Sequence, residues 1–308
     1  MKRLYLVGPL LFLATLNAFA QSVDLTHPLV LKQADENKDQ HFTMESRLTS
    51  ITPSGTVLGT DVYRLKISYD PQYNVPGKGK GFRCLAFSYS PGDSVTLGIP
   101  SLTNWTYVLP DAGTDKSGQV LGIDHARFEQ IKDDQGRLIP FDKAYHIYNT
   151  FVDFHAICSV FANPAEAGQS VADLHHIGDE IVHHAAFSQP PTHLGSHIAE
   201  GSFFKNGRIT LNLKGLTEEN SGACALIGYD SGRSAFKMIM HPMAEMEVVV
   251  NGYSHYWGDI VKSLDNHWVQ RATLVEIVAS EATLPMPPGK THSMVERQIL
   301  IRNVTDTR

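Results

Sequence analysis

The chain has 308 residues, with 26 Lys and Arg against 32 Asp and Glu, and a formal net charge of −6 at pH 7. This balance offers no electrostatic attraction for nucleic acid or for an anionic membrane surface, so it argues against both classes of partner. The length allows one large β domain or two smaller units, and either can bury a full core.

The N-terminus has the pattern of a secretory signal peptide. Lys2 and Arg3 precede an apolar run over residues 4–16, and Ala-Phe-Ala follows at 18–20. The run is too short to cross a bilayer, and no later run approaches the required length. We therefore expect residues 1–20 to be removed by cleavage before Gln21. The mature chain is then expected to be secreted or periplasmic, without a transmembrane segment.

The N-terminal half is predicted to be an arm followed by strands. Residues 21–40 are polar and are expected to form a flexible, solvated arm. Residues 56–70 alternate between apolar residues such as Leu65 and charged residues such as Lys66, which predicts a strand with one buried face. Together with strands at 41–52, 82–89 and 105–109, this strand defines an N-terminal β half over residues 41–121.

Residues 122–192 differ from both flanking regions and are predicted to be a central helical, histidine-rich segment. Ile147, Phe151, Phe154 and Cys158 recur at helical spacing, which predicts a buried helix rich in aromatic residues within 141–161.

The stretch 171–187, VADLHHIGDEIVHHAAF, allows two local structures. A helix that begins at Ser170 places Leu174 and Ile181 on one apolar stripe. The alternative is a hairpin with Gly178-Asp179 as its two-residue turn. Gly within a helix costs about 1 kcal/mol relative to Ala, so the hairpin stays open as an alternative.

Histidines and carboxylates in this stretch also predict a candidate metal site. In a helix, His176 with Glu180, and Asp179 with His183, lie at i and i+4, where two side chains can share a divalent ion. Zinc suits imidazole and carboxylate ligands, and the remaining ligands would come from elsewhere in the chain. The competing interpretations are solvated surface histidines and a pH-sensing cluster. No established metal-binding motif is present in the sequence.

The carboxylates also set an expectation for pH dependence. Asp179 and Glu180 should raise the pKa values of the neighbouring histidines if no metal is bound. The segment 171–187 is then expected to become more ordered between about pH 7.5 and pH 5.5.

Residues 193–308 are predicted to be an antiparallel β meander. The clearest hairpin signal is Asn251-Gly252, between expected strands at 245–250 and 253–257. Strands this long, joined by tight turns, must curl or pack on another layer. The fold class is therefore mainly β with a central helical insertion (α+β), built as a curved sheet, an open barrel or a sandwich. The strand pattern loosely resembles that of exported bacterial lipoprotein carriers.

Each of the three cysteines, Cys84, Cys158 and Cys224, lies in an apolar stretch. In an exported protein one pair could form a disulfide and leave a single thiol, or all three could be buried as small apolar residues.

The sequence contains no complete catalytic motif. It favours a non-enzymatic exported protein whose curved sheet binds an apolar ligand or an envelope partner, with residues 141–187 as a lid over the concave face. His255 and Trp257, together with Tyr148 and Phe151 of the central helix, are the predicted ligand-binding residues. The alternative function is a metal-dependent hydrolase or metalloprotein that uses the histidine stretch.

Overall fold

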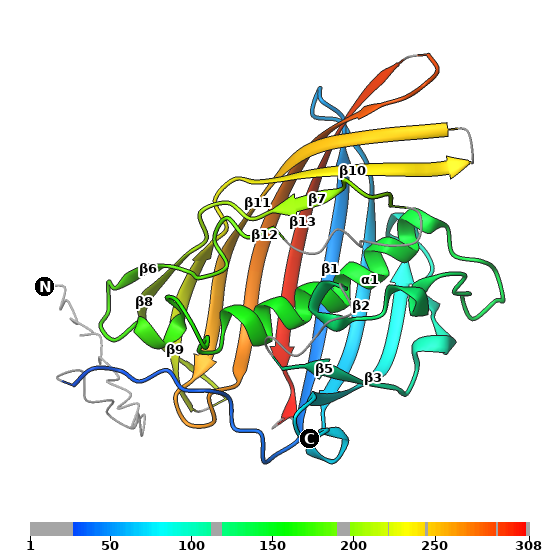
Figure 1. The fold of residues 1–308 in the computed structure, drawn as a ribbon. Helices are drawn as coiled ribbons and strands as arrows, with labels where there is room; N and C mark the ends of the chain where they lie inside the picture. Colours follow the sequence, from blue (N-terminus) through cyan, green and yellow to red (C-terminus); the bar gives the residue numbers. More distant parts are fainter. Residues whose placement is uncertain are drawn as a thin grey trace, which may run out of the picture.

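The computed structural model describes residues 27–305 except 112–118, 190–197, 221, 244–245 and 288. The predicted signal peptide, residues 1–20, lies outside the described residues. In the part of the chain that is described, thirteen strands form one antiparallel sheet with one α-helix on its concave face (Figure 1). The strands are β1 (Gln40–Ile51), β2 (Val57–Tyr69), β3 (Gly79–Ser90), β4 (Leu97–Gly98), β5 (Trp105–Pro110), β6 (Glu180–Val182), β7 (Phe203–Lys205), β8 (Thr210–Glu219), β9 (Gly222–Asp230), β10 (Ser234–Met243), β11 (Met246–Ser263), β12 (Val269–Thr283) and β13 (Lys290–Asn303).

The two β halves of the sequence build a single sheet rather than two domains. Its strand order is β4-β3-β2-β1-β13-β12-β11-β9-β8-β6, with β10 paired to β11 and to β7, and β5 paired to β3. The first and last long strands meet in the middle, where Phe42 pairs with Asn303 and Ile51 pairs with Met294. The predicted fold class, mainly β with a helical insertion and a curved antiparallel sheet, is confirmed.

The central helix α1 (Phe141–His155) lies across the concave face and continues into a π-helical turn, η6 (Ala156–Phe161). Its apolar side chains fill the space against the sheet. The Phe154 ring lies 5.3 Å from that of Phe42, and the Phe151 ring 5.7 Å from that of Phe87. The helix predicted within residues 141–161 is therefore confirmed, and the spacing of its aromatic residues follows from this packing.

The helix predicted over residues 171–187 is wrong. Ser170 does form a capping box with Asp173, but only the 3₁₀ turn η7 (Val171–Asp173) follows. The chain then extends into β6, where Ile181 pairs with Leu211 of β8. The hairpin alternative is also wrong, because the residues on the two sides of Gly178-Asp179 do not pair as two strands: β6 pairs with β8, and Gly178 N donates to Leu213 O at 2.8 Å. The free energy gained by pairing with β8 is therefore larger than the preference for a helix that the capping box creates.

The hairpin predicted at Asn251-Gly252 is wrong as well, since β11 runs through both residues without interruption. A Cβ on Gly252 would lie 2.3 Å from Cζ of Phe236 on β10. The glycine therefore makes room for an aromatic ring on the neighbouring strand, which is a packing role that Asn-Gly turn statistics cannot reveal.

Residues 27–39, expected to be a solvated arm, dock on one end of the sheet. Leu31 is 1% exposed. Trp268 Nε1 donates to the carbonyl oxygen of Asp35 at 2.5 Å, and Tyr69 Oη donates to that of Glu36 at 2.8 Å. Leu29, Leu31 and Ala34 of this segment are thus part of the core.

The cysteines Cys84, Cys158 and Cys224 are free and buried, as in the second of the two expectations. No helix among the described residues has the length and apolar character needed to cross a bilayer.

Candidate functional site

A row of polar side chains crosses the concave face next to α1. Tyr256 of β11 pairs with Glu276 of β12, which pairs with Arg297 of β13, so strand register places the three side by side. The Arg297 guanidinium donates to Glu276 Oε2 from Nε at 2.8 Å and from Nη2 at 2.6 Å. Its Nη1 donates to Asp153 Oδ2 of α1 at 2.5 Å, and its Nη2 also contacts the Tyr256 hydroxyl. We call these four residues the polar row.

The polar row holds two carboxylates for one guanidinium, almost out of contact with water. Arg297 is 8% exposed and Glu276 is 3% exposed. Burial raises the pKa of Asp153 to about 6, although Arg297 opposes the rise, and Glu276 adds to it. At neutral pH the row therefore carries one surplus negative charge, held in a poorly solvated place.

The polar row also divides the concave face into a covered and an open part. On the side of the row covered by α1, Leu274 and Ile299 are each 1% exposed. On the other side of the row, several apolar side chains of the same face are only partly buried. Further along β11, Val248 and Val250 are buried again. We call this partly exposed set the open apolar surface: Phe204 of β7, Phe236 and Met238 of β10, Val278 of β12 and Val295 of β13.

The four predicted ligand-binding residues do not lie together. His255 and Trp257 flank Tyr256 in β11, so strand alternation places them on the outer face of the sheet. There the Trp257 side chain is 39% exposed, and His255 Nε2 lies 2.8 Å from Asp230 Oδ1. Tyr148 and Phe151, in contrast, are buried: the Tyr148 ring lies 5.4 Å from that of Phe128, and the Phe151 ring lies 5.7 Å from that of Phe87 on β3.

Of the four predicted metal ligands, His176 and Asp179 lie together, with Nδ1 of His176 3.6 Å from Oδ2 of Asp179, but they do not converge with Glu180 and His183 into one site. Asp179 Oδ2 accepts hydrogen bonds from the backbone N–H groups of His175 at 2.8 Å and His176 at 2.7 Å, which closes a turn. Glu180 is exposed, whereas His183 is 1% exposed. Within the described ranges, no group of three or more His, Cys, Asp or Glu side chains could hold a metal ion. Zinc binding therefore stays a prediction, and the described residues do not provide a set of ligands for it.

The expected pKa shift in the histidine stretch has the opposite sign at two positions. Burial lowers the pKa of His183 to about 4, and burial also lowers that of His184. The carboxylates expected to raise these values lie elsewhere, since Asp179 is engaged by backbone N–H groups. A folded-state pKa below the unfolded value means stability that is lost as pH falls below about 6.5.

We therefore expect the segment 171–187 to lose protection from hydrogen exchange on acidification. Between about pH 7.5 and pH 5.5, protonation of His183 in the open state alone favours opening by about 1.3 kcal/mol, which is roughly a tenfold loss of protection. Exchange rates corrected for intrinsic chemistry measure this effect, and the variant His183→Gln should show little of it. Stronger protection at the lower pH would contradict the expectation.

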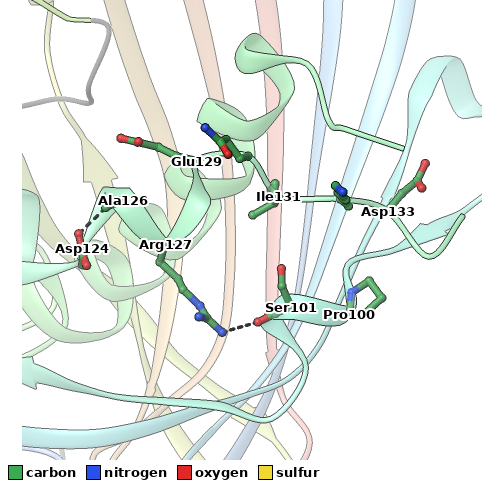
Figure 2. A pocket seen from close by; sticks show the side chains of 10 residues that line it. Pro100, Ser101, Asp124, Ala126, Arg127, Glu129, Ile131 and Asp133 are labelled. Atoms are coloured by element: carbon green, nitrogen blue, oxygen red, sulfur yellow. Dashed lines mark hydrogen bonds between the residues drawn. The ribbon is translucent and has the colours of Figure 1, made fainter. Parts of the chain in front are cut away.

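A shallow pocket of about 620 Å³ has none of the polar-row residues in its lining. Figure 2 shows the side chains that line it. Arg127 spans it, with Nη2 donating to Ser101 O at 2.6 Å. The charged side chains of its lining have both signs, so the pocket favours no particular ligand charge. Its lining residues are Pro100, Ser101, Asp124, Ala126, Arg127, Glu129, Gln130, Ile131, Lys132 and Asp133.

Sequence reasoning missed the polar row because its members are scattered along the chain; Asp153 and Arg297 alone are 144 positions apart. One signal was present. Glu276 and Arg297 occupy inward positions whose nearest inward neighbours along each strand are apolar, Leu274 and Val278 in β12 and Val295 and Ile299 in β13, and charged residues are seldom fully buried unless they are paired.

In comparisons with known proteins, no family model matches this chain and no curated protein sequence matches it.

Proposed function

We propose that this protein is an exported, non-enzymatic binding protein that holds an apolar ligand on the open apolar surface. Export is supported by the signal-peptide pattern of residues 1–20. The observation that carries the binding proposal is the unequal cover of the concave face: α1 buries one part and leaves the apolar side chains of the other partly exposed.

The ligand is placed beside α1 rather than beneath it. The aromatic side chains of the helix already fill the space under it, where Phe42, Phe151 and Phe154 are each at most 1% exposed. The open apolar surface offers a concave, preformed floor of the type that apolar ligands use. An alkyl chain that loses about 200 Å² of apolar surface there would be stabilised by roughly 5 kcal/mol before the entropic costs of binding.

The proposal predicts that Phe236→Ser weakens binding of the neutral apolar probe N-phenyl-1-naphthylamine by about tenfold, because part of the aromatic contact area is lost. Fluorescence titration measures the affinity, and circular dichroism confirms that the variant is folded. Met238→Ser, on the same strand and face, should act in the same direction.

The matched control is Ile277→Ser. Ile277 is also partly buried but pairs with His255 and faces the opposite side of the sheet. Its replacement should leave probe affinity unchanged. Equal affinities of the wild type, Phe236→Ser and Met238→Ser would refute the proposed function.

A further inference from the structure

The border between the open apolar surface and the α1-covered core is acidic. Asp153 and Glu276 share the single guanidinium of Arg297, so the polar row has one more negative than positive charge when its groups are ionised. Val278 and Val295 of the open apolar surface each lie two positions along a strand from Glu276 and Arg297, respectively. An apolar chain on that surface therefore ends beside the surplus charge.

A second, independent feature at this border is the hydroxyl of Ser254. Ser254 is 2% exposed, and its Oγ has no hydrogen-bond partner among the described residues. It lies two positions from Tyr256 in β11 and directly opposite Val278 of β12, so it joins the polar row to the open apolar surface. A buried hydroxyl without a partner costs about 1–3 kcal/mol, so a donor on a bound ligand that reaches Ser254 Oγ would relieve this cost.

We propose that the polar end of the ligand is a primary ammonium group, held at this border by Ser254 Oγ and by the surplus negative charge of Asp153 and Glu276. The ligand is then an amphiphile with a protonated amine and an apolar chain. The inference rests on the proposed function, because it assigns the chemistry of one end of the same ligand.

Charge and hydrogen-bonding capacity favour an ammonium over other polar ends. An ammonium brings one positive charge and three donors, and it meets one surplus negative charge and an unpaired hydroxyl oxygen. A carboxylate would add a second surplus negative charge in a poorly solvated place. An alcohol would satisfy Ser254 but leave the charge uncompensated.

The test compares three probes with the same chain, dodecylammonium, dodecanol and dodecanoate, below their micellar concentrations. Each competes with N-phenyl-1-naphthylamine at about pH 7.5, where Asp153 is ionised. We expect dodecylammonium to bind about tenfold more tightly than dodecanol, as for a charge-assisted hydrogen bond, and dodecanoate to bind most weakly. Adding dodecylphosphoethanolamine distinguishes a lipid headgroup from a simple long-chain amine.

Two variants locate the effect. Asp153→Asn removes the surplus charge and leaves the Arg297–Glu276 pair, so the preference for dodecylammonium should disappear while dodecanol affinity is unchanged. The matched control is Asp142→Asn on the same helix. This substitution also removes one negative charge, but from a side chain that is 64% exposed and lies outside the polar row. Ser254→Ala should weaken dodecylammonium binding several-fold.

The outcomes separate the two proposals. If none of the probes binds, the proposed function fails and this inference fails with it. If all three bind equally, or if dodecanoate binds most tightly, the function stands and the ammonium assignment is overturned. The assignment is also overturned if Asp142→Asn lowers dodecylammonium affinity as much as Asp153→Asn, which indicates general attraction to an acidic protein. If Ser254→Ala binds dodecylammonium as tightly as the wild type, the Ser254 hydroxyl does not contact the ligand and is instead hydrogen-bonded to an internal water.

Discussion

Replacing Arg297 with methionine is expected to lower the free energy of unfolding by about 3–5 kcal/mol at neutral pH. Methionine has a similar length, so little packing is lost. The two carboxylates that the guanidinium bridges, on Asp153 and Glu276, would remain buried without a positive partner. Loss of the partner then leaves the desolvation of both carboxylates uncompensated, which is the costly way to break a buried ion pair.

Equilibrium denaturation with urea measures the effect, and two further variants define its origin. The charge-free combination Asp153→Asn, Glu276→Gln and Arg297→Met should recover most of the lost stability, because it removes the unpaired charges as well. Arg302→Met, at an exposed position of the same strand, should change stability by no more than about 0.5 kcal/mol. If Arg297→Met and Arg302→Met are equally stable, the polar row does not hold α1 against the sheet.

Acidification is the second change with a large expected effect, and it acts through buried histidines such as His155 on α1. This imidazole is 0% exposed, its Nε2 lies 2.6 Å from Tyr107 Oη, and its Nδ1 has no partner among the described residues. Burial lowers the pKa of His155 to about 3. In the folded state the ring is therefore neutral at any ordinary pH.

The direction of the pH effect follows from linkage. A histidine with an unperturbed pKa near 6.5 takes up a proton on unfolding below that pH, whereas folded His155 does not, so its contribution to stability declines as pH falls from about 6.5 toward 3. Between about pH 7 and pH 5 the loss is about 2 kcal/mol.

Other buried groups change the size of this effect. Burial also lowers the pKa values of His146 and His183 to about 4, which adds to the loss. Asp153 opposes it, because its raised pKa of about 6 means that the folded state takes up a proton first and gains about 1 kcal/mol over the same interval. The histidines together outweigh the aspartate, so the net result is destabilisation by acid.

Urea denaturation at the two pH values checks the prediction. The double variant Tyr107→Phe with His155→Phe removes the titrating ring together with its hydrogen-bond partner, and its loss of stability on acidification should be about 2 kcal/mol smaller. His292→Gln, which replaces a solvent-exposed histidine, should behave like the wild type. A wild-type stability that does not fall between pH 7 and pH 5 contradicts the assignment.

The strands and the central helix could be predicted because their signals are local. Alternation of Leu65 with Lys66 along β2 marks one wet and one buried face, and the spacing of Ile147, Phe151 and Phe154 marks one buried face of a helix. Each pattern reports a periodicity of the backbone itself. Neighbouring residues are therefore sufficient to identify the element and to give a close estimate of its ends.

Local signals misled where a distant strand offered better partners. Ser170 and Asp173 cap a turn as predicted, yet the chain beyond them extends because β8 provides unpaired backbone groups. Asn251-Gly252 matches a hairpin turn, yet Gly252 lies within a long strand where Phe236 needs the space. In both cases the energy of long-range pairing or packing exceeds a local preference of about 1 kcal/mol.

The candidate site belongs wholly to the tertiary structure. By itself the sequence determined the β architecture, the position of the helix and the acidic balance of the chain, because composition and periodicity are properties of residues close together. Only the fold decided that Asp153, Glu276 and Arg297 meet, since the register of β12 and β13 and the position of α1 depend on contacts between residues far apart. Charged side chains acquire unusual pKa values only once such contacts have removed them from water.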